Sequence, residues 1–153
     1  VGSLRKGGAT EETLDRLDLH DAVEFISDVS ESDLVEIFGS AHVAVVPSLY
    51  EGFSLPAVEL MSCATPLVAT TAGALPEVVG PDGHAALRVP PGDPEELASA
   101  LARVLDDDEL ASRLGAAGRQ RVIDHYTWSV VAARTVDWYR DCMAKAANTA
   151  EGE

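Results

Sequence analysis

Short apolar runs rich in β-branched residues alternate with helical patterns along the chain, and this alternation restricts the possible folds more than any other feature of the sequence. Runs of this length and composition are typical of strands. A strand, a helix and a second strand in units of this size form a right-handed parallel crossover. We therefore predict an α/β fold, a Rossmann-like doubly wound parallel sheet with C-terminal helices. The expected strands are Val23–Ser27, His42–Val46, Pro66–Thr70 and Ala85–Val89.

Capping residues and prolines locate the helices. Ser30 and Asp93 each suit an N-cap, and Pro94 suits a first helical position because its missing N–H has no partner to lose there. The expected helices are about Glu11–Leu17, about Glu31–Phe38, one from Leu55 or Pro56, a short one from Leu75, one from Pro94, one around Leu110–Ile123, and one from Trp128 to about Met143.

The chain of 153 residues is long enough to bury one ordinary hydrophobic core. We treat residues 1–143 as one domain, truncated at its N-terminus because Val1-Gly2 reads as the end of a strand. Residues 144–153 have no apolar period, and we expect them to form a disordered tail.

The composition argues against several classes of function. Eleven basic against 26 acidic residues give a formal net charge of −15, which opposes binding to nucleic acid or to an anionic membrane surface. No apolar stretch approaches the roughly 20 residues that span a bilayer. Cys63 and Cys142 belong to no close-spaced metal or redox pattern, so we expect reduced thiols and a cytoplasmic protein.

The stretch PSLYEGFSLPAVELM (Pro47–Met61) combines a turn with two glutamates at the end of an expected strand. Open α/β sheets bind ligands at the carboxyl ends of their strands. Gly52 lets the backbone approach a ligand, and the following helix N-terminus favours a phosphate. Because a phosphate repels carboxylates, Glu51 and Glu59 suit neutral hydroxyls beside it. A nucleotide sugar, with a hydroxylated ring at each end of a diphosphate, meets both demands.

The spacing of the two glutamates is also compatible with different roles. In so acidic a chain, two solvated surface glutamates are the commoner case. Strand–turn–helix phosphate sites also serve many unrelated functions. A glycosidase pair of carboxylates would need one raised pKa in an apolar cleft, and the sequence shows no such environment.

The same stretch, continued to Gly80, resembles the retaining GT-B glycosyltransferases of the glycosyl transferases group 1 family. Val89–Ala98 and Tyr126–Ser129 resemble later landmarks of that family, so the likeness covers nearly the whole chain. The resemblance implies the C-terminal, nucleotide-sugar-binding half of an enzyme that transfers a hexose from a UDP- or GDP-sugar to a hydroxyl acceptor. Glycolipid, polysaccharide or other glycoconjugate synthesis would use such a reaction.

The resemblance also implies roles for individual residues. Glu51 would be the catalytic residue, in contact with hydroxyls of the donor sugar, and Glu59 would contact the ribose hydroxyls. Ser54 and Ala64 stand where the family often has glycine, which we expect to matter little. The other donor-binding residues would be Gly52, Phe53, Ser54 and Leu55 through their N–H groups, Thr71 and Gly73 in a neighbouring loop, and Phe25, Ile26 and Ser27 near the base.

A larger departure concerns parts of the family pattern that this sequence lacks. Family members carry an arginine and a lysine that neutralise the leaving diphosphate, and an N-terminal domain that binds the acceptor; Arg5 and Lys6 do not match that context. The expected partners are therefore the nucleotide-sugar donor and the missing domain of the same chain, and the isolated fragment should be inactive. The resemblance implies no cofactor, no metal and no membrane span, although the whole enzyme could act at the inner face of a membrane. A GT-B sugar-nucleotide epimerase and a non-catalytic interaction domain are the alternatives.

The remaining chemistry-bearing residues suit ordinary structural roles. Asp106–Asp108 contains an Asp-x-Asp pattern that holds a metal in another class of glycosyltransferase, but it lies between two expected helices, where acidic residues are ordinary caps. The 4 histidines have no partners at metal-ligand spacing. Glu77 suits the positive end of a helix. Trp128, Trp138 and Tyr139 have the spacing of core residues, although the resemblance implies a final helix that crosses back toward the missing domain, which would leave some of them exposed here.

Overall fold

The computed structural model describes the backbone of residues 7–150 and the side chains of residues 7–146. The chain divides into two compact units, Val1–Glu36 and Ile37–Glu153, and helix α2 (Glu31–Ser40) crosses the boundary between them. Each unit is described by itself.

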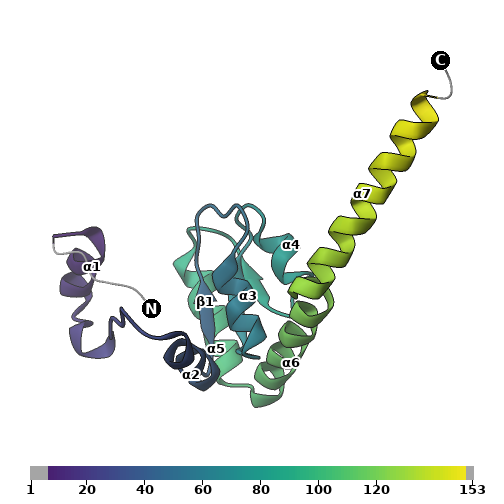
Figure 1. Ribbon diagram of the computed structural model, residues 1–153. Helices are drawn as coiled ribbons and strands as arrows, with labels where there is room; N and C mark the ends of the chain where they lie inside the picture. The colour runs from purple at the N-terminus through teal and green to yellow at the C-terminus, as the bar shows by residue number, and fades with distance from the viewer. Residues whose placement is uncertain (1–6, 151–153) are drawn as a thin grey trace. The chain divides into compact units, whose positions relative to one another are not determined.

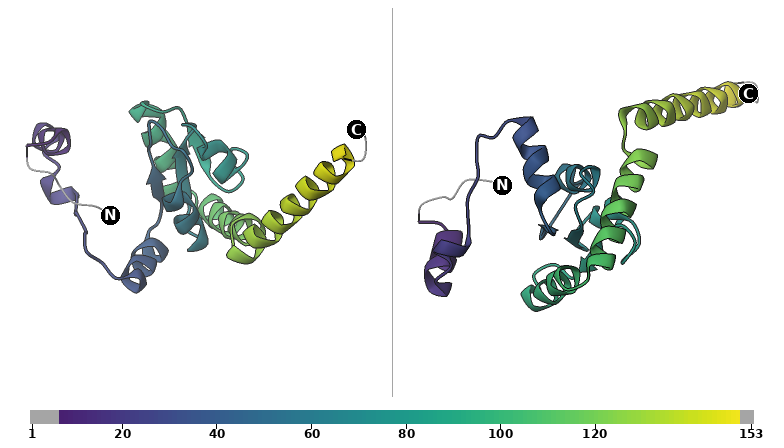
Figure 2. Two further views of the ribbon diagram at one scale, coloured as in Figure 1. Left: turned by 45° about the horizontal axis from the view of Figure 1, so that its top comes forward. Right: turned by 90° about the horizontal axis from the view of Figure 1, so that it is seen from below.

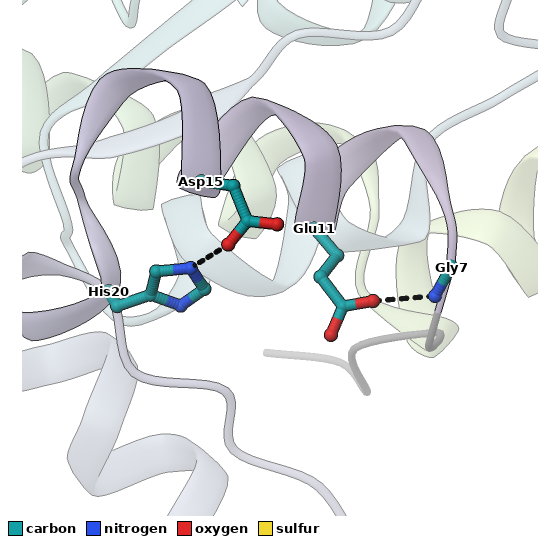
Figure 3. A network of polar contacts seen from close by, with 4 residues as sticks. All are labelled: Gly7, Glu11, Asp15 and His20. Carbon is teal, nitrogen blue, oxygen red and sulfur yellow. Dashed lines mark hydrogen bonds and ion pairs between the residues drawn. The ribbon is translucent and has the colours of Figure 1, made fainter.

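The first unit contains helix α1 (Ala9–Leu17) and a short 3₁₀ helix, η1 (His20–Ala22). Two polar contacts lie at the two ends of α1 (Figure 3). The N–H of Gly7 donates to the Glu11 carboxylate at 2.5 Å, and His20 Nε2 lies 2.6 Å from Asp15 Oδ1. Because Glu11 lies in the first turn of α1, its charge also complements the positive end of the helix. These contacts lie on exposed groups and organise the unit locally.

The strand predicted at Val23–Ser27 is wrong. These residues have no regular structure, and the described part of the chain forms a sheet of 3 strands, none of which lies in the first unit. A β-branched, apolar run becomes a strand only when a neighbouring strand accepts and donates its backbone hydrogen bonds. Ser30 does cap α2 as predicted, because its Oγ accepts a hydrogen bond from the Asp33 N–H at 3.2 Å.

The second unit is built on a parallel sheet with the strand order β1-β2-β3. Figure 1 labels β1 of this sheet and the helices of the unit. Val45 of β1 pairs with Val68 of β2, and Ala69 of β2 pairs with Arg88 of β3. The strands are β1 (Ala44–Val46), β2 (Leu67–Thr70) and β3 (Leu87–Val89), each within one of the predicted runs.

Helices follow each strand at the predicted places. Asp93 caps α5 by accepting from the Glu96 N–H at 3.0 Å. Helix α7 continues to Ala150, whereas we expected it to end near Met143, and the alanines and lysine beyond Met143 favour helix. The core role expected from the spacing of its aromatic residues is wrong, because Trp128, Trp138 and Tyr139 are exposed. The chain turns sharply between α6 and α7 (Figure 2). The helices are α3 (Leu55–Ser62), α4 (Leu75–Val79), α5 (Pro94–Leu105), α6 (Asp108–His125) and α7 (Trp128–Ala150).

Two apolar clusters cover the two faces of the sheet. Leu67 and Ala69 of β2 pack with residues of α3 and α4, whereas Val68 packs with α5 residues such as Val104. Helix α6 comes so close to the turn after α3 that a Cβ added at Gly115 would lie 2.2 Å from the Ala64 carbonyl oxygen. Helices on both faces of a parallel sheet confirm the predicted Rossmann-like fold.

Among residues 7–150, no helix combines the length and the apolar character that crossing a lipid bilayer requires.

Candidate functional site

The carboxyl ends of the three strands carry the candidate site. The loop after β1 runs from Pro47 to Ser54, and the loop after β2 runs from Thr71 to Ala74. Two hydrogen bonds link neighbouring strand ends. Thr70 Oγ1 donates to the Ser48 carbonyl oxygen at 2.6 Å, and the Thr71 N–H donates to the Val89 carbonyl oxygen at 2.9 Å. The parallel arrangement therefore brings both predicted loops to one edge of the sheet.

Glu51 is held from two sides. Ser48 Oγ donates to the Glu51 carboxylate at 2.9 Å, in a partly buried position. The Glu51 carbonyl oxygen accepts a hydrogen bond from the Ala74 N–H, also at 2.9 Å. Because an ionised carboxylate has room for several acceptor contacts, one donor from Ser48 leaves capacity for a ligand hydroxyl.

Gly73 makes the close approach of the two loops possible. Its φ is +53°, in the left-handed region that favours glycine. A Cβ at this position would lie 2.1 Å from the Glu51 carbonyl oxygen, closer than real Cβ atoms come to any heavy atom. Gly73 therefore fixes the position of Glu51 by allowing backbone contact, a role that we did not predict for it.

The residues after Glu51 lead into helix α3. Ser54 is buried, with 1% of its surface exposed, and its Oγ accepts from the Ala57 N–H at 3.4 Å as the N-cap. Its side chain therefore serves the helix and not a ligand. Within the described residues, the N–H groups of 52–55 have no hydrogen-bond partner, so they are available to an anion at the helix N-terminus.

The remaining predicted residues fall into two groups. Glu59 is exposed on α3, one turn after its start, and Thr71 is exposed beside Gly73. Phe25, Ile26 and Ser27 belong to the first unit, where Ser27 Oγ donates to the Asp28 carboxylate at 3.1 Å. The structure therefore brings the predicted residues of the second unit to one edge, and the role of 25–27 beside a base stays a prediction.

A hollow of about 190 Å³ lies at the same edge of the sheet. Leu49, Val89 and Leu97 give it a largely apolar lining, and Asp93, which also lines it, caps α5. Neither Glu51 nor Glu59 lines this hollow. The hollow is therefore separate from the two carboxylates.

The acidic run between α5 and α6 serves as a cap, as we expected. Asp107 Oδ1 accepts from the Leu110 N–H at 2.9 Å and begins α6. Across the part of the chain that the structure describes, no group of three or more histidine, cysteine or acidic side chains is arranged to hold a metal ion.

Comparison with known proteins identifies the family. The sequence profile described as "Glycosyl transferases group 1" matches residues 6–121. The chain belongs to this family. It is 48% identical over 147 residues to the MMP alpha-(1->4)-mannosyltransferase of Mycolicibacterium hassiacum, a match that covers 96% of the chain and 36% of the relative.

Solved structures show the same fold. Sucrose-phosphate synthase from Thermosynechococcus elongatus superimposes with a TM-score of 0.80 at 37% identity, covering 94% of this chain and 37% of that one. Anabaena Alr3699/HepE, solved in complex with UDP-glucose, gives a TM-score of 0.77 at 20% identity over 86% of this chain and 36% of that chain. The second unit is thus the Rossmann-like half of a GT-B fold, and the chain spans little more than a third of these relatives.

Proposed function

We propose that this chain supplies the donor-binding part of a retaining glycosyltransferase that transfers a hexose from a UDP- or GDP-sugar to a hydroxyl acceptor. The observation that carries the proposal is the pairing of a carboxylate held in place with unpaired N–H groups next to it. Glu51 is fixed by Ser48 and Ala74, and the N–H groups of residues 52–55 follow it directly. The carboxylate accepts hydrogen bonds from sugar hydroxyls, and the N–H groups bind the diphosphate.

Two comparisons support the choice of ligand. The relative at 48% identity is named a mannosyltransferase, and the Anabaena protein of the same fold was solved with UDP-glucose bound. In our proposal Glu59 accepts from the ribose hydroxyls, because side chains on a helix tilt toward its N-terminus and Glu59 lies one turn after the start of α3.

The proposed reaction keeps the configuration of the anomeric carbon. The acceptor oxygen forms a bond to that carbon on the face from which the diphosphate departs, the bond from carbon to diphosphate oxygen breaks, and the acceptor proton passes to the departing diphosphate. The protein contributes position and electrostatic stabilisation and no nucleophile. Glu51 orients the sugar, the N-terminus of α3 stabilises the charge that develops on the diphosphate, and the proposal requires no metal.

An NMR titration of the chain with UDP, GDP and their hexose derivatives tests the proposal. We expect the amide signals of Gly52, Phe53 and Gly73 to shift, and those of exposed α5 residues, on the far side of the sheet from α3, to stay in place. If no nucleotide or nucleotide sugar shifts these amides at millimolar concentration, the donor-site assignment is wrong. For variants in which Glu51 or Glu59 is replaced by glutamine, Glu77→Gln is the matched control. Glu77 is also an exposed glutamate, and it lies near the start of a neighbouring helix.

A further inference from the structure

Tyr126, the C-cap residue of helix α6, contacts the loop after β1 and helix α4. Its ring meets the ring of Phe53 edge to face, with centroids 5.8 Å apart and planes at 71°. Its Oη lies 3.3 Å from the Glu77 carbonyl oxygen and 3.2 Å from the Val78 carbonyl oxygen, at the end of α4. One side chain thus contacts both the loop after β1 and the helix after β2.

Both contacts bear on the position of Glu51. Phe53 lies two residues after Glu51 in the same loop and is 46% exposed, and the ring of Tyr126 packs against its ring. Helix α4 begins directly after Ala74, whose N–H donates to the Glu51 carbonyl oxygen. Movement of either element therefore displaces Glu51.

The ring of Tyr126 matters more than its hydroxyl. Arg121 already donates to the same carbonyl oxygens at shorter distances, 2.7 Å from Nε to Val78 and 2.6 Å from a terminal nitrogen to Glu77. The hydroxyl is therefore a second donor to carbonyls that have a stronger one. The contact with Phe53 is made by the ring alone.

We propose that Tyr126 is a positioning residue for nucleotide-sugar binding, and that its ring holds the loop from Glu51 to Ser54 in its binding conformation through Phe53. The inference rests on the proposed function for the identity of the ligand, but the ring of Tyr126 restrains the loop whether or not a ligand is bound. The ring and the hydroxyl of Tyr126 have different roles in this proposal, and substitutions can remove them separately.

The test compares Tyr126→Phe, which keeps the ring, with Tyr126→Leu, which removes it. In the protein without ligand, we expect Tyr126→Leu to shift the amide signals of Gly52 and Phe53 and to speed hydrogen exchange of the Ala74 N–H. Tyr126→Phe should leave both close to wild type. An aromatic pair of this geometry contributes enough that Tyr126→Leu should weaken nucleotide-sugar binding by about 2- to 10-fold, whereas Tyr126→Phe should bind with nearly wild-type affinity.

A second variant keeps the test decisive if Tyr126→Leu does not fold. Phe53→Leu removes the same ring pair from the loop side, and urea unfolding of every variant shows whether the native state is populated where binding is measured. Unchanged loop amides and unchanged Ala74 exchange in the folded leucine variants would overturn the inference. If wild type binds nucleotide sugars and the leucine variants bind equally well, the inference fails and the proposed function stands. If wild type binds no nucleotide sugar but the leucine substitutions still shift the loop amide signals, the proposed function fails and the restraint of the loop by Tyr126 stands.

Discussion

Replacing Gly73 by alanine tests the backbone contact that fixes Glu51. Gly73 has a φ of +53°, and its added Cβ would lie 2.1 Å from the Glu51 carbonyl oxygen and 3.0 Å from the Glu51 nitrogen. Both neighbours are backbone atoms, so no side-chain rotation relieves the overlap. The loop after β1 must move away from the loop after β2, and the hydrogen bond from the Ala74 N–H to the Glu51 carbonyl oxygen must lengthen or break.

The expected cost has four contributions. Alanine in the left-handed region costs about 1–2 kcal/mol, and its lower entropy in the unfolded chain returns about 0.4–1 kcal/mol. Loss of the hydrogen bond to Glu51 adds about 1 kcal/mol, and residual strain from the overlap adds about 1–2 kcal/mol more. We therefore expect Gly73→Ala to lower the free energy of unfolding by about 2–5 kcal/mol.

Gly83→Ala is the matched control. Gly83 also has a positive φ, +72°, but a Cβ there would meet no heavy atom within 4 Å. The control therefore carries the same backbone strain and the same entropy change in the unfolded chain, without the contact to Glu51. Its expected cost is about 1 kcal/mol. Urea unfolding followed by circular dichroism gives both values, and the difference between the variants isolates the contact.

The same variants also separate stability from binding. Under conditions where both are folded, Gly73→Ala should weaken nucleotide-sugar binding because it displaces Glu51, and Gly83→Ala should not. Equal losses of stability in the two variants, together with unchanged amide signals around Glu51 in Gly73→Ala, would refute the argument that Gly73 fixes this loop.

Four further predictions concern single residues and metal ions. Gly52→Ala should leave stability within about 0.5 kcal/mol, since its Cβ would meet nothing within 4 Å, yet weaken nucleotide binding in a calorimetric titration if a ligand approaches the backbone there; unchanged affinity would count against that approach. Ser54→Ala should cost about 1 kcal/mol in urea unfolding, because the N-cap of α3 is lost, and a stable variant would contradict the cap. Gly115→Ala should cost about 1–3 kcal/mol, since its Cβ would overlap the Ala64 carbonyl oxygen, and α6 would have to pack differently if no cost were found. Transfer by the whole enzyme should survive removal of divalent metals with EDTA, and a loss that Mg²⁺ or Mn²⁺ restores would show a metal requirement.

The sheet and its helices could be predicted because their signals are local. The runs that became β1, β2 and β3 are short and apolar, and Pro94 and Asp93 mark the start of α5 in the sequence itself. Such capping residues act on the next few residues of the chain, so no knowledge of distant contacts is needed.

The prediction of a strand at Val23–Ser27 was wrong because pairing of a strand depends on segments elsewhere in the chain. Its side chains are as suitable for a strand as those of β1, but a strand also needs a neighbour in the right register, and the described residues offer it none. Composition reports the preference of a segment and cannot report whether a partner is present.

The location of the candidate site could be predicted from the sequence, but the contacts that hold Glu51 could not. The position of Glu51 after a strand and before a helix follows from the sequence pattern, and the structure places it at the carboxyl edge of the sheet. The groups that hold it could not be foreseen. Ser48 lies in the same loop, but Ala74 and Tyr126 come from segments far along the chain, and only the fold brings them together.

Calorimetric titration of Glu51→Gln and Glu59→Gln with UDP, GDP and the corresponding nucleotide sugars tests the central claim most directly, with Glu77→Gln as the control. A hydrogen bond to a charged group contributes about 1.5–3 kcal/mol, so each lost contact should weaken binding by about tenfold or more. We predict that Glu51→Gln weakens binding of the nucleotide sugar but not of the nucleotide alone, that Glu59→Gln weakens both, and that Glu77→Gln changes neither. Wild-type affinity for the nucleotide sugars in Glu51→Gln would contradict the account.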